Sequence, residues 1–218
     1  MNESGEALFV AFEGIEGSGK STQATRAAEW LRARACRVVS VREPGGTELG
    51  ERMRELLLRP VGPEMAPWAE LCAYMAARAQ LMAEVIAPAL AAGRIVLADR
   101  FGEASVAYQG GGRELGTERV GVLYRWVTGG VVPGRVYLLD LAPEDGLARA
   151  SARGGGRLDR LESEPLSFHR RVRDSYLRQA REEPERFRVL DASLPAAVLE
   201  ESIRNDLMML LDRGSGPR

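Results

Sequence analysis

Residues 7–22 read ALFVAFEGIEGSGKST, and this stretch decides the fold. An apolar run over 7–12 predicts a short strand, and residues 23–34 have the pattern of a helix. Between them, residues 14–21 match G-x-x-x-x-G-K-[ST], in which glycines let backbone N–H groups turn towards an anion and the N-terminus of the helix adds positive charge. The stretch therefore predicts a phosphate-binding loop for a nucleoside triphosphate.

The residues of this loop have separate expected roles. Lys20 would reach the outer phosphates as a point charge, and the Ser21 hydroxyl would bind Mg²⁺. Of the 30 basic residues only Lys20 is a lysine, so the one compact ammonium stands among the expected phosphates. A glycine-rich turn that matches by chance is the alternative, and the agreement of strand, turn and helix argues against it. The expected nucleotide-binding residues are Gly14, Ile15, Glu16, Gly17, Ser18, Gly19, Lys20, Ser21 and Thr22.

Length and composition indicate one globular domain over 1–218, with a flexible tail at 213–218. The 218 residues are 45% hydrophobic and 28% charged, and the formal net charge is −1. No overall field would attract DNA, RNA or an acidic membrane, so phosphate recognition has to come from local arginines. Cys36 and Cys72 have no metal-like spacing, and we expect reduced, partly buried thiols. Because neither a signal peptide nor a membrane span is recognised, we expect a cytoplasmic protein.

Strand-like and helical segments alternate along the chain. Further strands are predicted at 37–41, 95–98, 136–141 and 188–190, with helices between them. This order favours an α/β fold with a five-stranded parallel sheet and helices on both faces. In such sheets ligands bind beyond the carboxyl ends of the strands. Four charged residues are expected at or near those ends: Glu13, Arg42, Asp99 and Asp140.

The predicted helices after the first one cover 47–58, 67–92, 116–128, 143–152, 162–183 and 195–211. Thr47 is the expected cap of the first of these, and Pro88 should kink the long helix or mark a restart. Three glycines at 110–112 predict a hinge or a loop. His169, the only histidine, is expected on a helix surface and is assigned no role.

Charged residues at two strand ends predict contacts with phosphates. Asp99 is the expected acidic partner of the loop, orienting Mg²⁺ or its waters. Arg100 follows it, where a hydrolase that activates water would carry glutamate, and a bidentate arginine suits the phosphate of a second substrate. Arg42 could share that phosphate. The alternatives are a surface ion pair at Asp99 and Arg100, and a plain Pro-Gly-Gly turn after Arg42.

Two other groups have both a functional and a purely structural interpretation. Tyr74 and Arg78 are four residues apart, so a ring that stacks on a base and a guanidinium that donates to a base oxygen would share one helix face. A core aromatic beside a solvated arginine is the alternative. Arginines around three glycines at 154–156 predict a basic lid over about 149–161 that closes over transferring phosphates, and a solvated loop is the alternative.

Several motifs in one chain resemble those of thymidylate kinases. In order they are FEGIEGSGKST, REPGGT, YMAAR, ADRF followed by SVAYQGGGR, and RLDRLE. The resemblance covers about residues 8–211, and this combination is far more specific than the phosphate-binding loop alone. It implies a P-loop kinase fold, usually in a homodimer, that transfers the γ-phosphoryl group of ATP to dTMP with Mg²⁺.

The resemblance also implies roles in binding dTMP. Glu16 matches the acidic residue that contacts the 3′-hydroxyl of the deoxyribose, and Tyr108 matches the aromatic residue under the sugar. Tyr74 matches the ring that stacks on thymine, and Arg78 the arginine that binds its carbonyl. The expected dTMP-binding residues are Glu16, Arg42, Pro44, Tyr74, Arg78, Arg100, Ser105 and Tyr108, of which Arg42 and Arg100 hold the acceptor phosphate.

Catalysis is expected to depend on lid arginines. One sub-type of the family carries its catalytic arginine inside the P-loop, and Gly17 stands at that position here. The chain therefore resembles the bacterial sub-type with lid arginines. Arg153 and Arg157 are the expected catalytic residues of the lid, together with Lys20 and Arg100.

Two other functions fit the sequence less well. A P-loop kinase for another deoxynucleotide or for a deoxynucleoside is the nearest alternative, but the pair of Arg42 and Arg100 favours an acceptor that already carries phosphate. A GTPase-type switch would bind guanine through an N-K-x-D segment. The only asparagines are Asn2 and Asn205, and neither precedes a lysine, so the sequence argues against a switch.

Overall fold

A computed structural model describes residues 7–58, 65–153 and 158–213. The strands are β1 (Leu8–Glu13), β2 (Val38–Arg42), β3 (Ile95–Asp99), β4 (Arg135–Asp140) and β5 (Phe187–Asp191). They pair in parallel in the order β2-β3-β1-β4-β5. The predicted five-stranded parallel sheet is confirmed, and every strand end lies within one residue of its predicted position.

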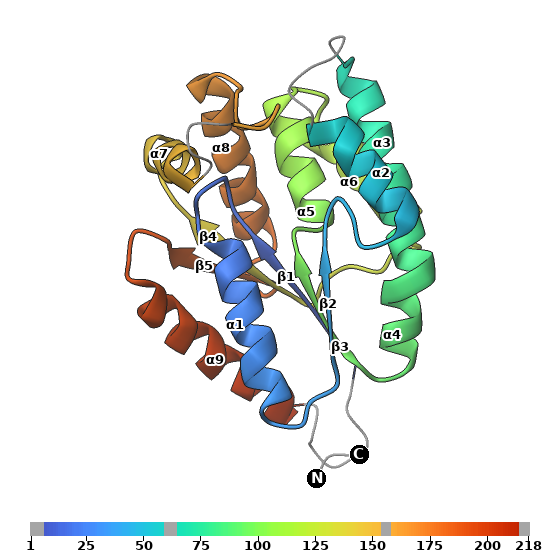
Figure 1. Cartoon of the computed structure of the whole chain (residues 1–218), viewed down its shortest axis with the longest axis vertical. Helices are drawn as coiled ribbons and strands as arrows, with labels where there is room; N and C mark the ends of the chain where they lie inside the picture. Colours follow the sequence, from blue (N-terminus) through green and yellow to red (C-terminus); the bar gives the residue numbers. More distant parts are fainter. Residues whose placement is uncertain (1–6, 59–64, 154–157, 214–218) are drawn as a thin grey trace.

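Helices fill the connections between the strands. In order they are α1 (Lys20–Arg32), α2 (Glu48–Leu58), α3 (Pro67–Leu81), the π-helix η1 (Met82–Ile86), α4 (Ala87–Ala91), α5 (Gly102–Ser105), the π-helix η2 (Val106–Gly112), α6 (Thr117–Val127), α7 (Pro143–Arg153), α8 (Leu166–Glu182) and α9 (Ala196–Arg213). α1 packs against α9 over one face of the sheet, and α4 and α8 lie on the other (Figure 1). The predicted α/β architecture is therefore confirmed. Within the described part of the chain, no helix is long and apolar enough to cross a membrane.

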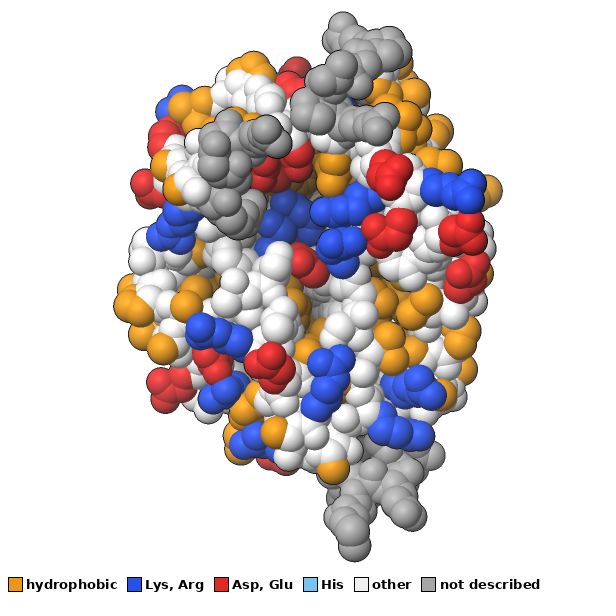
Figure 2. All heavy atoms as spheres, viewed as in Figure 1, with side chains coloured by type: hydrophobic (Ala, Val, Ile, Leu, Met, Phe, Trp, Pro, Cys, Tyr) orange, Lys and Arg blue, Asp and Glu red, His pale blue; other side chains and the backbone are white. Residues whose placement is uncertain are grey.

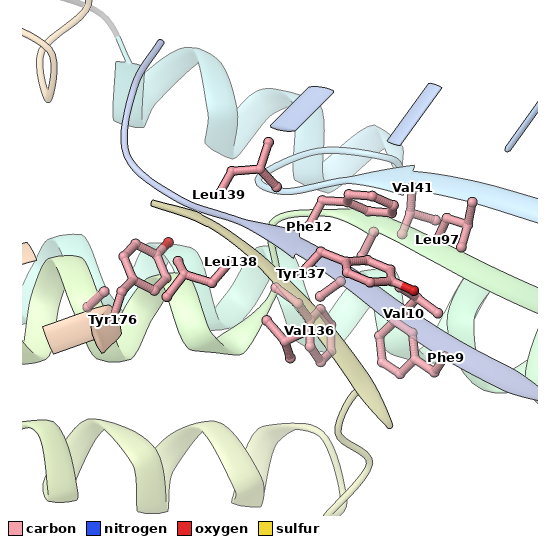
Figure 3. Packing of buried hydrophobic residues seen from close by; sticks show 14 of the residues in the cluster. Phe9, Val10, Phe12, Val41, Leu97, Val136, Tyr137, Leu138, Leu139 and Tyr176 are labelled. Carbon is pink, nitrogen blue, oxygen red and sulfur yellow. The ribbon is translucent and has the colours of Figure 1, made fainter. Parts of the chain in front are cut away.

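The interior strands carry the core. Residues 9–13 of β1 are all buried, as are the first five residues of β4, because helices cover both faces of a parallel sheet. The rings of Phe12 on β1 and Tyr137 on β4 lie 5.3 Å apart, and Leu97 of β3 and Val41 of β2 continue this packing along the sheet (Figure 3). This packed interior holds the carboxyl ends of the strands in fixed positions.

The long helix predicted over 67–92 changes its winding near Pro88. α3 passes into η1 at Met82, and α4 follows with Pro88 as its second residue. Proline has no N–H to donate to the carbonyl of Glu84, and its ring crowds that carbonyl. The wider π-turn just before Pro88 makes room for the ring. The predicted interruption at this proline is confirmed.

The prediction of a hinge or a loop at 110–112 is wrong. These three glycines end η2, which continues directly from α5 and packs along α8. A Cβ on Gly112 would lie 2.6 Å from the ring of Phe168, and a Cβ on Gly111 would lie 2.7 Å from the Cβ atom of Ser175. The glycines therefore allow two helices to approach closely, which a side chain at either position would prevent.

Three smaller expectations have different outcomes. Cys36 is half-buried, but Cys72 faces solvent on α3, so partial burial is confirmed only for Cys36. Thr47 caps α2 as predicted, because its hydroxyl accepts a hydrogen bond from the backbone N–H of Gly50 at 3.0 Å. α9 continues to Arg213, so the prediction of a flexible tail is wrong for residue 213, and residues 214–218 lie outside the described part.

Candidate active site

A cavity of about 380 Å³, here called the central cavity, lies at the carboxyl ends of β1, β2 and β3. Basic side chains gather around a hollow on this face, with acidic side chains beside them (Figure 2). All eight residues predicted to bind the acceptor line this cavity: Glu16, Arg42, Pro44, Tyr74, Arg78, Arg100, Ser105 and Tyr108. Lys20, Ser21 and Asp99 also line it. The structure thus brings these predicted residues, from separate elements and loops along the chain, to one place.

The loop between β1 and α1 has the backbone that its glycines predict. The φ angles of Gly14, Gly17 and Gly19 are positive. A Cβ on Gly17 would lie 2.2 Å from the carbonyl oxygen of Gly146 in α7, so only glycine fits at this position. α1 begins at Lys20, three residues earlier than predicted, and its first turn therefore faces the loop. The positive end of α1 and the turned backbone form a receptacle for phosphate groups.

Lys20 folds back over this loop. Its Nζ donates a hydrogen bond to the carbonyl oxygen of Ile15 at 3.3 Å. Burial and the nearby charge of Arg100 lower the pKa of Lys20 to about 8. An anion bound beside Nζ would reverse this effect, so the environment of Lys20 favours binding of a phosphate.

Arg100 joins the loop, η2 and α8. Its Nη1 donates to the carbonyl oxygen of Gly14 at 3.0 Å and to the hydroxyl of Tyr176 at 3.2 Å. Its Nη2 donates to Glu16 Oε1 and to the hydroxyl of Tyr108, both at 3.0 Å. The φ angle of Arg100 is +70°, in the left-handed region that costs about 1–2 kcal/mol for a residue with a side chain. This predicted phosphate ligand is therefore held at the cavity by four contacts, and its ion pair is with Glu16 rather than with Asp99.

His169 lies in the interior of the protein, so the prediction of a surface position is wrong. Its side chain is 1% exposed, and its Nδ1 lies 3.4 Å from Glu16 Oε2. Against the effect of burial, His169 and the charge of Arg100 hold the pKa of Glu16 well below its usual range. The polar sequence of α8 gave no sign of this position, because burial of His169 follows from the close approach of α8 to η2.

Glu13 is the last residue of β1 and is fully buried. Its Oε1 accepts a hydrogen bond from the backbone N–H of Phe101 at 2.7 Å, and its Oε2 accepts one from the hydroxyl of Tyr176 at 2.7 Å. Burial raises the pKa of Glu13 to about 8, so its carboxyl group is largely protonated at neutral pH. Glu13 thereby joins β1 to α8 and adds little negative charge beside the phosphate-binding loop.

Arg78 is 1% exposed, so the alternative of a solvated arginine is wrong. Its Nε and Nη2 donate to Glu43 Oε2 at 2.9 and 2.6 Å. Nη2 also donates to Ser105 Oγ at 3.0 Å. Nη1 contacts only the sulfur of Met75, at 3.4 Å, among the described residues. A thioether is a weak acceptor, so Nη1 keeps hydrogen-bonding capacity for a ligand in the central cavity.

Tyr74 lies one turn before Arg78 on the same face of α3. Its side chain is half-buried at the cavity wall, and burial raises the pKa of its hydroxyl, which stays neutral. The predicted placement of a ring and a guanidinium on one helix face is therefore confirmed as geometry.

Two further arginines reach the central cavity from β2 and α2. Arg42 pairs with the carboxylate of Glu51 at 3.2 Å, and both side chains are about half exposed. Arg54, which the sequence analysis did not single out, donates through Nη1 to the carbonyl oxygen of Pro44 at 3.0 Å. Burial and the charge of Arg42 lower the pKa of Arg54, as expected for two cations that face one site. This part of the cavity therefore favours an anion.

Ser21 and Asp99 provide the oxygen atoms that were predicted for Mg²⁺. Mg²⁺ prefers oxygen ligands, keeps several waters and needs only one or two protein groups besides phosphates. No cluster of three or more ligating His, Cys, Asp or Glu side chains occurs in the described residues. The donor set fits a metal ion that is held mainly by substrate phosphates and water.

Only the two ends of the predicted lid can be placed. Arg157 lies outside the described residues, and Arg153 ends α7 with a side chain that is likewise outside the description. At the other end, Arg160 Nη1 donates to Glu70 Oε2 at 2.6 Å, and Arg160 Nε donates to the carbonyl oxygen of Leu57 at 2.8 Å. The lid is therefore tied to α3 one turn before Tyr74, and the two predicted catalytic arginines of the lid remain predictions.

Some residues of the central cavity were missed by the sequence analysis. Glu43 lies in REPGGT, and Asp159 and Leu161 lie in RLDRLE, so membership of these motifs was the available signal. The sequence signal for Arg54 was weaker. It lies in the helix that follows a strand end, and such a helix begins at the ligand-binding edge of the sheet. No feature of the sequence pointed to His169.

Comparison with known proteins gives one consistent result. The family model of thymidylate kinase matches residues 12–203. The chain is 48% identical to a thymidylate kinase of Pseudomonas savastanoi pv. phaseolicola and 49% identical to one of Pseudomonas fluorescens, each over 209 residues that cover 96% of this chain and 99% of the relative. The crystal structure of thymidylate kinase from Ehrlichia chaffeensis is similar with a TM-score of 0.73 at 30% identity, over 91% of this chain and 97% of that one.

Proposed function

Because the chain belongs to the thymidylate kinase family, we propose that dTMP binds in the central cavity and that ATP binds at the P-loop beside it. The enzyme transfers the γ-phosphoryl group of ATP to dTMP and gives dTDP. We place it in the cytoplasm, which supplies ATP and Mg²⁺.

One observation carries the assignment of the acceptor site. The eight residues predicted to bind dTMP come from the P-loop, β2, α3, α5 and η2 and from loops between them, and all eight line the central cavity. Its volume, about 380 Å³, lies in the range of small-molecule sites. Lys20 and Ser21 of the P-loop form part of the same wall, so donor and acceptor phosphates can meet there.

The proposed chemistry is positioning and charge stabilisation. Arg42 and Arg100 hold the acceptor phosphate in line, with Arg54 beside them, and Lys20 and Arg100 stabilise negative charge on the transferring group. An acceptor phosphate already carries an anionic oxygen, so the reaction needs no strong general base. Arg153 and Arg157 would complete the charge stabilisation when the lid closes.

Ser21 and Asp99 are the proposed protein ligands of Mg²⁺, with Asp99 acting directly or through water. When bound, Mg²⁺ neutralises the β- and γ-phosphate oxygens of ATP. This assignment is supported by the position of both oxygen donors in the central cavity next to Lys20.

The base of dTMP is proposed to lie against α3. Tyr74 would stack on thymine, and Arg78 would donate from Nη1 to a thymine carbonyl, because its other nitrogens are taken by Glu43 and Ser105. The bidentate pair with Glu43 fixes the guanidinium plane, which gives the contact its direction.

We further propose a homodimer formed through α2, α3 and α6. α3 packs against both α2 and α6, and the three helices lie together at one side of the molecule (Figure 1). On α6, Trp126 is 83% exposed and Val122, one turn before it, is 51% exposed. Trp68 on α3 and Leu56 on α2 are also exposed. Large apolar side chains on neighbouring helices favour burial against a second copy.

The acceptor assignment can be tested by ADP release from ATP and Mg²⁺ with dTMP, dUMP, dCMP, dGMP, UMP or thymidine as acceptor. We expect fast turnover with dTMP, slow turnover with dUMP and none with thymidine. Turnover with thymidine would contradict the phosphate-binding role of Arg42 and Arg100. Equal turnover with all the monophosphates would contradict the base-binding role of Tyr74 and Arg78.

A further inference from the structure

Two rings on α8 face the carboxyl groups of Glu13, at the end of β1, and of Glu16, in the P-loop. Tyr176 bonds to Glu13 Oε2, and His169, two helical turns earlier, lies against Glu16 Oε2. Both positions are buried. α8 therefore contacts the end of β1 through Tyr176 and the P-loop through His169. The proposed reaction assigns no role to His169.

The two oxygens of Glu16 have different surroundings. Oε1 accepts hydrogen bonds from Arg100 Nη2 at 3.0 Å and from the hydroxyl of Tyr108. Oε2 is buried and has no hydrogen-bond partner among the described residues. The nearby cations Arg100 and Lys20 both favour the ionised form of Glu16. A buried carboxylate oxygen that accepts no hydrogen bond destabilises the folded protein, so we expect a donor close to Oε2.

His169 is the group that can supply this donor. Its Nδ1 lies 3.4 Å from Glu16 Oε2, and neither of its nitrogens has a hydrogen-bond partner among the described residues. The ring is fixed edge-on against the neighbouring Phe168, with centroids 5.4 Å apart. Two unpartnered groups that face each other inside a protein are each satisfied by one hydrogen bond between them.

We infer that His169 is a positioning residue for dTMP: it donates from Nδ1 to Glu16 Oε2 and thereby aims Glu16 Oε1 at the central cavity. This inference rests on the proposed contact between Glu16 and the 3′-hydroxyl of dTMP. It assigns His169 no contact with substrate. Its effect reaches the acceptor only through the orientation of the Glu16 carboxylate.

The kinetic test compares two variants of nearly equal shape. His169→Asn keeps an N–H donor near the position of Nδ1, whereas His169→Leu removes it. We expect His169→Leu to raise KM for dTMP about tenfold, which corresponds to about 1.4 kcal/mol, with kcat changed less than about twofold. His169→Asn should restore KM to within about twofold of wild type. Equal KM values in His169→Leu and wild type would overturn the inference.

An acceptor without the 3′-hydroxyl separates this role from a general loss of packing. With 3′-deoxythymidine monophosphate, the KM values of wild type and His169→Leu should agree, because the group that Glu16 contacts is missing. A tenfold difference that persists with this analogue would mean that His169 acts through packing, which overturns the inference.

A spectroscopic test is available because the chain contains a single histidine. In an untagged protein labelled with ¹⁵N, all imidazole signals come from His169, and their shifts report which nitrogen carries a proton. We expect a proton on Nδ1 in wild type and a changed Nδ1 shift in Glu16→Gln. An unprotonated Nδ1 in the wild-type protein would contradict the inference.

Glu16→Gln also distinguishes the possible failures. If wild type phosphorylates dTMP but Glu16→Gln leaves KM unchanged, the role of Glu16 is wrong and the inference falls with it. If Glu16→Gln raises KM and His169→Leu does not, only the inference is wrong. If wild type does not phosphorylate dTMP at all, the proposed function itself fails.

Discussion

Removing the carboxylate of Glu43 should destabilise the protein strongly. Glu43 and Arg78 form an ion pair whose side chains are 5% and 1% exposed, with a closest contact of 2.6 Å. Glu43→Ala leaves the guanidinium buried without its counter-ion, which costs about 3–5 kcal/mol. A chain of this length loses about 2–4 °C in Tm per kcal/mol, so Tm should fall by about 6–20 °C.

Thermal unfolding followed by circular dichroism measures this effect. Glu43→Gln is the matched control, since it keeps the shape of the side chain and one acceptor oxygen. Its Tm should fall less than that of Glu43→Ala. A fall of less than about 2 °C for Glu43→Ala would refute the reasoning, because it would mean that water or another group compensates the charge of Arg78.

The double variant Glu43→Met with Arg78→Met separates stability from binding. Replacing both members of a buried pair by apolar residues of similar volume is often neutral or stabilising, so Tm should recover most of the loss. KM for dTMP should stay raised, because Nη1 of Arg78 is gone. Recovery of both Tm and KM would contradict the base-binding role of Arg78.

Three other changes test separate parts of the structure. Lys20→Ala should lower kcat in the ADP-release assay by about 10²–10³-fold and leave Tm nearly unchanged, and normal turnover would refute the role of Lys20. Burial raises the pKa of Glu13 from about 4.5 to about 8, so the folded protein holds a proton that the unfolded chain has released, and stability should fall as pH rises across that interval. Glu13→Gln should flatten this fall in Tm measured from pH 5 to 9, and an unchanged slope would contradict the raised pKa. Trp126→Glu should convert a dimer to a monomer in sedimentation equilibrium, whereas Val198→Glu, an equally apolar exposed site on α9, should leave the mass unchanged.

The strands and the phosphate-binding loop were predictable because local pattern decides them. The strands of a covered parallel sheet are apolar on both faces, and each of the five runs is bounded by polar residues or turn residues. The order of strands and helices then places Glu13, Arg42 and Asp99 at one edge, whatever the details of packing. The shared position of the predicted acceptor residues follows from this topology.

What the sequence could not predict depends on contacts between distant segments. His169 occurs in a helix rich in arginine, and its burial is decided by how closely that helix approaches η2. That approach depends in turn on Gly111 and Gly112, which as a local pattern indicate a loop. The alternative of a solvated Arg78 stayed open for the same reason, since its partner Glu43 lies 35 residues away in the chain.

The backbone of Arg100 has a consequence for how this site can change. At a φ of +70°, any residue with a side chain is strained, and glycine alone would relieve the strain. Glycine would also remove the four contacts through which the guanidinium joins the P-loop, η2 and α8. At this position, the residue that would relieve the backbone strain is therefore one that cannot make the side-chain contacts. A substitution chosen for thermostability here would disconnect the phosphate-binding residues, so engineering for stability should leave Arg100 unchanged.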